Sequence, residues 1–261
     1  MSRNVTLPIA MKCKGLHISL VRITLKNVPG ALAKVASLMA KYNINILSSI
    51  LDAPLGAPKA TMISFIDYSK IKAPLEQVIG ELKELNDVLE VDVIKPQLPG
   101  LIVNELFYSL TCLDDRCVLI HISNIGEVLR YLYERFGPAA KTIMYHAGYG
   151  GIKDAIGVLK KITGLKGLSL MKACLRLFQA YGFGRFQVTF YRLKEILVVR
   201  AYDLFECEVF RGKLKQPNSH IFRGILAYIA EEVVGKEVEV EETKCIAKGD
   251  PYCQFVIRPR E

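Results

Sequence analysis

Apolar and polar residues follow two periods along the first 100 residues, which predict the order strand, helix, strand, strand, helix, strand. Residues 17–25 are rich in Ile, Val and Thr, as is typical of a strand. Next, Pro29 fixes a backbone angle suited to a helix start. The helix that follows has the i, i+3, i+4, i+7 spacing of one buried face, at Leu32, Val35, Ala36 and Met39.

The remaining elements complete a known arrangement. Two further strands and a second helix are expected at residues 44–53, 60–68 and 73–86. In the last strand Leu89, Val91 and Val93 should face inward, because acidic residues alternate with them. This order predicts a ferredoxin-like βαββαβ domain over residues 15–96.

Two prolines and a glycine interrupt the pattern at residues 95–100, so a second domain is expected over residues 101–261. It begins with strand-like runs and helical stretches, one of which carries an apolar stripe at Val128, Leu129, Leu132 and Phe136. Strand-like segments, a helix and a hairpin follow at residues 186–210, 220–235 and 237–257. The mixture predicts a larger α+β domain with an antiparallel sheet and packed helices.

The seven cysteines are odd in number and scattered, which in an intracellular protein is more typical of core residues or ligands than of a disulfide framework. If Asp114-Asp115 forms a two-residue turn, Cys112 and Cys117 face each other with the close spacing that a disulfide needs. Reduced packing thiols are the alternative that we favour. Cys174 and Cys207 have apolar neighbours and are expected in the core.

Near the C-terminus, Cys245 and Cys253 flank residues 248–251, whose sequence KGDP is a strong turn signal. Two thiols placed across such a turn could ligate a metal, form a disulfide, pack reduced against the sheet or carry out chemistry.

Composition and charge narrow the function classes. Hydrophobic residues make up 51% and charged residues 23% of the chain, as in a globular protein, and no apolar run approaches the roughly 20 residues of a membrane span. The start lacks the apolar centre of a signal peptide, so we expect a cytoplasmic protein. The net charge of +9 divides into +4 before residue 101 and +5 after it. Without a basic stripe or reading motif, this charge favours anionic small molecules over nucleic acid.

No catalytic constellation is evident. The glycines of residues 148–151 lack the Lys-Ser/Thr of a phosphate loop, and their position in a helical run is wrong for a dinucleotide fingerprint. No nucleophile, base and orienting group stand out together.

Residues 26–48, KNVPGALAKVASLMAKYNINILS, resemble the ACT domain, a small regulatory module. The resemblance covers about residues 15–96. It implies that such domains pair side by side and bind amino acids or similar effectors at the shared edge. Asn27 and Gly30 in the first loop and Asn45 at the second strand would supply the ligand contacts. Loss of the ligand, with dimerisation retained, is the alternative.

The second part resembles the 4-vinyl reductase domain family in YHAGYGG, GFGRFQV, SHIFRGILAYIAEEVVG and, most specifically, ETKCIAKGDPYCQF. This resemblance implies a fold that binds small molecules and pockets that suit aromatic or long apolar ligands between helices and sheet.

The family's sensors of aromatic compounds hold zinc through Cys, Glu, Cys and Cys, and Glu242, Cys245 and Cys253 keep that spacing. The first cysteine of the pattern falls on Ser219, which is a poor zinc ligand. The adjacent His220 is a good ligand type, although its side chain leaves the backbone in another direction.

These observations predict a non-catalytic cytoplasmic regulator, expected to be a homodimer. It would bind an amino acid at the first domain and an apolar or aromatic molecule, with a structural zinc, at the second. The alternatives are a reductase acting on a vinyl tetrapyrrole, suggested by the family's name, and a regulator that binds DNA directly, suggested by the charge.

Overall fold

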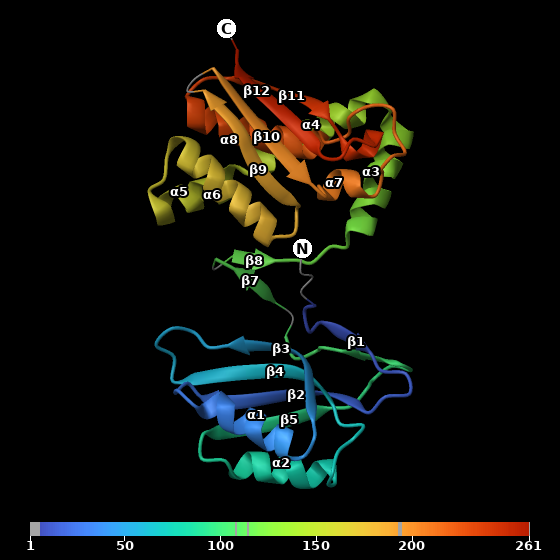
Figure 1. Cartoon of the computed structure of the whole chain (residues 1–261), viewed down its shortest axis with the longest axis vertical. Coiled ribbons are helices and arrows are strands. Elements are labelled where there is room, and N and C mark those ends of the chain that lie inside the picture. Colours follow the sequence, from blue (N-terminus) through green and yellow to red (C-terminus); the bar gives the residue numbers. More distant parts are fainter. Residues whose placement is uncertain (1–5, 108, 114, 193–194, 261) are drawn as a thin grey trace. The chain divides into compact units, whose positions relative to one another are not determined.

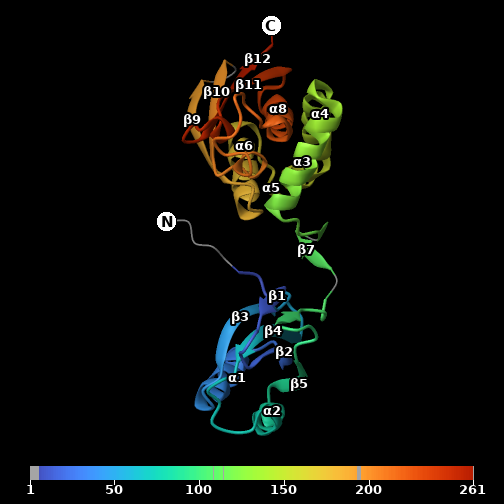
Figure 2. The same cartoon turned by 90° about the vertical axis from the view of Figure 1, so that its right-hand side faces the viewer.

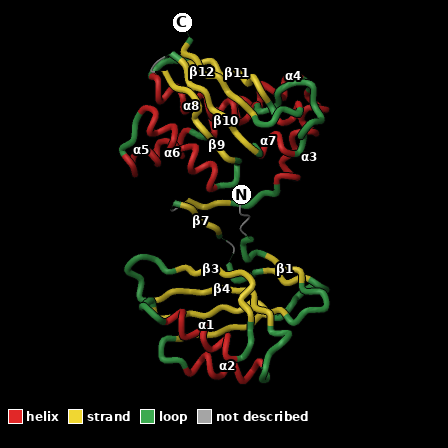
Figure 3. The backbone as a smooth tube through the Cα atoms, viewed as in Figure 1, coloured by secondary structure: helices red, strands yellow, loops and turns green. Residues whose placement is uncertain are grey.

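The computed structural model describes residues 6–107, 109–113, 115–192 and 195–260. The chain divides into two compact units, Met1–Val118 and Leu119–Glu261. Each unit combines antiparallel strands with helices (Figure 3), which confirms the predicted α+β class.

Unit 1 has an antiparallel four-stranded sheet with the strand order β3-β4-β2-β5 (Figure 1). Its two helices cover one face of the sheet and enclose the main core of the unit. The elements are β2 (Ile18–Lys26), α1 (Ala31–Lys41), β3 (Asn45–Asp52), β4 (Lys59–Asp67), α2 (Leu75–Glu84) and β5 (Val88–Ile94). The element order is the predicted one. Val35 and Met39 are buried as expected, whereas Leu32 remains 39% exposed.

The alternation predicted for the last strand fails at its first residue. β2 pairs with β5 at Thr24–Glu90 and then at Leu25–Val88, so Leu89 lies in a bulge. Val88 takes the inward position, and Leu89 is 46% exposed.

The second face of this sheet is covered by two strands that the sequence pattern did not reveal. β1 (Ala10–Lys12) pairs antiparallel with β6 (Leu101–Val103). Ile102 packs there in a small core with Leu20 and Phe65. Strands of three residues carry too little periodicity to be recognised.

The predicted facing of Cys112 and Cys117 is wrong. β7 (Leu110–Cys112) and β8 (Asp115–Cys117) do form a hairpin. Cys112 aligns with Asp115, and Leu110 with Cys117, so the two thiols occupy different pairs of the ladder. Asp114, on which the predicted turn depended, is outside the described residues.

Unit 2 has an antiparallel sheet with the order β11-β12-β10-β9. Its helices lie toward one face of the sheet, α8 and α6 against the strands and α3 and α4 beyond α8 (Figure 2). The helices are α3 (Ile122–Phe136), α4 (Pro138–Gly151), α5 (Lys153–Thr163), α6 (Gly167–Ala180), α7 (Phe205–Glu208) and α8 (His220–Val234). The strands are β9 (Arg185–Arg192), β10 (Ile196–Tyr202), β11 (Val238–Lys244) and β12 (Cys253–Pro259).

Two sequence predictions for this unit need correction. Residues 205–208 form the short helix α7 and not the end of a strand. Of the stripe expected in α3, Leu129 is buried, but Val128 and Phe136 are 58% and 50% exposed. The α3 face that packs on the core is centred on Gly126 and Leu129, because Gly126 lies directly against Val209 next to α7.

α4 and α8 touch through their backbones. A Cβ atom added at Gly148 would lie 2.0 Å from the carbonyl oxygen of Ile221, and one at Gly224 would lie 2.0 Å from that of Tyr145. The glycines of YHAGYGG and FRGIL therefore serve helix packing. This close contact fixes the position of α4 relative to the N-terminal end of α8, where the candidate site lies.

Candidate functional site

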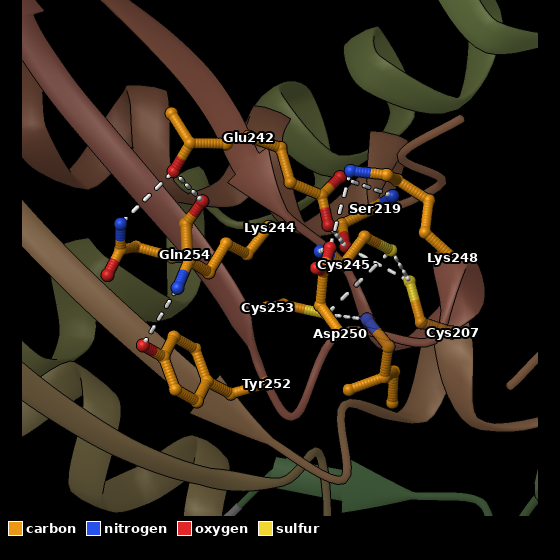
Figure 4. Close-up of polar contacts among 12 residues, drawn as sticks. Cys207, Ser219, Glu242, Lys244, Cys245, Lys248, Asp250, Tyr252, Cys253 and Gln254 are labelled. Atoms are coloured by element: carbon orange, nitrogen blue, oxygen red, sulfur yellow. Dashed lines mark hydrogen bonds and ion pairs between the residues drawn. The ribbon is translucent and has the colours of Figure 1, made fainter. Parts of the chain in front are cut away.

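Four buried side chains from unit 2 gather at the N-terminal end of α8: Cys207, Glu242, Cys245 and Cys253. One ligand atom from each lies within 4.8 Å of the others, as Figure 4 shows. Three sulfurs and a carboxylate form a donor set that suits zinc.

The final hairpin positions three of the four. Cys245 follows β11, and the 3₁₀ turn η1 (Ile246–Lys248) returns the chain to Cys253 at the start of β12. Gly249 ends that turn with φ 96°, a conformation that L side chains rarely adopt. The Cys245 N–H donates to Asp250 Oδ2 at 2.8 Å, and the Ile246 N–H donates to Cys253 Sγ at 3.4 Å. The turn thus orients both thiols before any ligand is bound.

The sulfur spacing matches a tetrahedral ion. Zinc–sulfur bonds of about 2.3 Å at tetrahedral angles place sulfurs about 3.8 Å apart. Cys245 Sγ lies 3.5 Å from Cys207 Sγ and 3.9 Å from Cys253 Sγ. The four side chains present therefore fit a metal ion with four protein ligands.

The electrostatics of the cluster point the same way. Hydrogen bonds from Cys207 and Cys253 lower the pKa of the Cys245 thiol far below its ordinary value. The hydrogen bond that Cys207 shares with Cys245 in turn raises the pKa of Cys207. Burial, followed by the charge of Cys245, raises the pKa of Glu242 to about 8. Negative charge is therefore concentrated in a buried site, where a cation would stabilise it.

The structure brings together three of the four predicted metal ligands, Glu242, Cys245 and Cys253. His220 is not among the four clustered groups, and Cys207, which the sequence placed in the core, completes the set. Apolar neighbours hid Cys207, and its ligand role depends on a fold contact with Cys245, 38 residues further along the chain. The one available signal was an incomplete set with a further cysteine nearby in the chain.

Ser219 occupies the position of the missing cysteine and supports the cluster. Its Oγ lies 3.0 Å from Cys207 Sγ and donates to Glu242 Oε1 at 2.6 Å. Its N–H donates to Glu242 Oε2 at 3.0 Å. Both carboxylate oxygens are thereby oriented by one residue.

Glu206, next to Cys207, caps α8 from outside that helix. Its side chain is fully buried, and its two oxygens accept the N–H groups of Ile221 at 2.8 Å and Phe222 at 2.9 Å. These are N–H groups that the first turn of a helix cannot satisfy itself. α7 is thus held to α8, which places Cys207 in the cluster.

We expect Glu206→Ala to lower the free energy of unfolding by about 3 kcal/mol, because two N–H groups at the start of α8 lose their acceptors. Glu206→Gln, which keeps one acceptor oxygen, should lose about half as much. Urea unfolding with zinc held at a fixed concentration measures both. Wild-type stability in Glu206→Ala would contradict the capping role.

A cavity of about 710 Å³ adjoins the cluster, between α4, α8 and the free edge of β11. Glu242 belongs to both the cavity wall and the cluster. The other residues that line it are Lys141, Thr142, Tyr145, His146, Gln216, Pro217, His220, Arg223, Val238, Glu239, Val240, Glu241 and Arg260.

The three residues predicted to bind an amino acid in unit 1 do not meet within one chain. Asn27 follows the last residue of β2, whereas Asn45 aligns, through Asp67, with Ile18 at its start. Eight strand steps separate the two ends by about 26 Å. Gly30, at φ 89°, starts α1 on the Asn27 side. The Asn27 amide donates to the carbonyl oxygen of Ala57 at 3.0 Å.

Comparison with known proteins gives two relatives of the unit 2 fold and its surroundings. The phenol regulator MopR of Acinetobacter guillouiae is 24% identical over 194 residues, which cover 70% of this chain and 33% of that protein. This chain thus spans about a third of the length of that relative. The phenol-responsive sensory domain of the transcription activator PoxR, solved with phenol, shares its fold. The TM-score is 0.51, at 16% identity over 72% of this chain and 92% of that chain.

Among the residues that the structure describes, no helix has both the length and the apolar character needed to cross a membrane. Residues 19–87 match the ACT domain family, and residues 197–259 match the 4-vinyl reductase domain family. Both predicted resemblances are thereby confirmed. The chain therefore joins an ACT domain to a 4-vinyl reductase domain.

Proposed function

We propose that this protein is a non-catalytic sensor whose 4-vinyl reductase domain binds a small molecule in the cavity between α4, α8 and β11. The observation that carries the proposal is that Glu242 lines this cavity and also belongs to the four-residue cluster. A ligand in the cavity would thereby touch a side chain that the cluster and Ser219 hold in place. The names of the two relatives, a phenol regulator and a phenol-responsive sensory domain, support a sensing role.

The cluster is proposed to hold a structural zinc through Cys207, Glu242, Cys245 and Cys253. Four protein ligands are typical of structural zinc sites, whereas catalytic sites keep one position open. Zinc would join α7 to the final hairpin and supply the positive charge that the buried thiolate requires.

Native mass spectrometry of the purified full chain, combined with metal analysis, tests the sensor and the zinc together. We expect about one zinc per chain and a carried-over small molecule that dissociates on collisional activation. Turnover of a vinyl tetrapyrrole with a nicotinamide cofactor would favour a reductase instead. DNA retardation that weakens with salt would favour a direct DNA-binding regulator.

At the ACT domain we propose an amino-acid site completed by two copies of the chain. Asn27 and Gly30 of one copy would meet Asn45 of the other, because a single copy holds them at opposite ends of β2. Gly30 lets a ligand approach the backbone, and the start of α1 offers N–H groups to a carboxylate. The proposed homodimer follows from the same geometry, and light scattering should report it at micromolar concentration.

Complementation tests the shared site. The amino acid that most raises the wild-type unfolding temperature, chosen from the twenty standard ones, serves as the probe. Asn27→Ala and Asn45→Ala should each weaken its binding by about tenfold, since each removes hydrogen bonds to a charged group. Mixed heterodimers of the two variants should recover one intact site per dimer. Failure to recover would show that the two residues do not belong to one shared site.

A further inference from the structure

The cavity beside the cluster is lined by cationic and donor groups that have no acidic partner among the described residues. Lys141 Nζ contacts the neutral side chain of Gln216, at 3.3 Å. Arg223 stacks over the Tyr145 ring at 5.7 Å and has no carboxylate in ion-pair distance within the described part of the chain. Its Nε is buried without a hydrogen-bond partner there. Two positive side chains from α4 and α8 thus converge on one cavity without neutralisation.

His220 gives the second, independent observation. Its side chain lines the cavity and is 6% exposed, and its Nε2 has no hydrogen-bond partner in the residues that the structure describes. The ring packs edge-on against Tyr133 at 6.1 Å, which holds it in place. Buried polar atoms are normally paired, so an unpaired one that faces a cavity indicates a ligand atom.

The glutamates of β11 do not neutralise these groups. Side chains alternate along the strand, and Val238 and Val240 are buried on the helix side. Glu239 and Glu241 are exposed on the opposite face, where Glu241 pairs with Arg258. Glu242 is committed to Ser219. Arg260, at the rim, pairs at the surface with Glu237, and the exposed His146 completes the set of charged and titratable groups around the cavity.

From this arrangement we propose that the cavity binds an organic anion, whose carboxylate or phosphate is held by Arg223, Lys141 and His220. The inference rests on the proposed small-molecule function of the cavity and specifies its ligand class. A guanidinium binds either group through two parallel hydrogen bonds. Tyr145 and the buried valines of β11 would contact the apolar part of the ligand. The specificity differs from recognition of neutral phenol, which the names of the relatives describe.

Thermal unfolding of the full chain with benzoate, phenyl phosphate and phenol tests this ligand class. Phenol is uncharged at pH 7, and the three share a phenyl ring, so they separate the charge from the ring. We expect the anions to bind at least about tenfold more tightly than phenol, because a charge-assisted hydrogen bond exceeds about 1.4 kcal/mol. The stronger of the two anions identifies the head group.

Variants assign the effect to the cavity. Arg223→Gln and Lys141→Gln should remove the preference for anions. Arg130→Gln is the matched control, because Arg130 pairs with Glu127 on the surface of α3 and its loss changes the net charge equally. Equal binding of phenol and the anions, or a preference that survives in Arg223→Gln, would overturn the anion inference and leave the sensor proposal standing. No binding of any of the three compounds would overturn the inference and count against the cavity as a sensor site.

Discussion

Cys207→Ser should purify with almost no zinc, where the wild-type chain carries about one ion. The variant should lose about 3 kcal/mol or more of its free energy of unfolding, because metal binding contributes directly to folding in a site of this kind. Serine is close in size, so the loss is of a ligand and not of packing. Metal analysis by mass spectrometry and urea unfolding measure the two effects.

Cys174→Ser is the matched control. Cys174 is as deeply buried as Cys207 but lies on α6 and is not one of the four clustered residues. This variant should lose stability and keep its zinc. Zinc retained in Cys207→Ser would exclude Cys207 as a ligand.

A swapped pair sharpens the test. Ser219 Oγ lies 3.0 Å from Cys207 Sγ, so a thiol at position 219 could reach the same ion. The double variant Cys207→Ser with Ser219→Cys should therefore recover zinc that the single variant loses. Recovery would show that the ligand can be supplied from either the α7 or the α8 side of one site.

Gly224→Ala should lower the free energy of unfolding by about 3 kcal/mol, the largest effect expected from a single added methyl group in this chain. The new Cβ would lie 2.0 Å from the carbonyl oxygen of Tyr145, a distance that no side-chain adjustment can relieve. α4 must move away from α8, which also opens the cavity between them. Urea unfolding at fixed zinc, together with binding of benzoate, measures both consequences.

Gly157→Ala in α5 provides the contrast. A Cβ there has nothing within 4 Å, and glycine inside a helix is less favourable than alanine by roughly 0.5–1 kcal/mol. This variant should be slightly more stable than the wild type. Equal stability of the two glycine variants would contradict the close contact between the helices.

The sequence alone determined the order of elements in the ACT domain and the three metal ligands of the final hairpin. Both depend on local signals. The first follows from the apolar period and the Pro-Gly helix start, and the second from Glu242, Cys245 and Cys253 within twelve residues around one turn. Local spacing fixes such features because neighbouring residues in one hairpin or helix have few possible relative positions.

Tertiary structure decided what joins distant segments. Cys207 became a ligand because Glu206 fastens α7 to the start of α8, and that contact has no sequence period. Likewise, Lys141 and Arg223 share a cavity because Gly148 and Gly224 let two helices touch. Asn27 and Asn45, grouped by resemblance, lie at opposite ends of a strand in one chain because β3 runs parallel to β2. In each case the packing of elements, and not the residue pattern within them, sets which side chains meet.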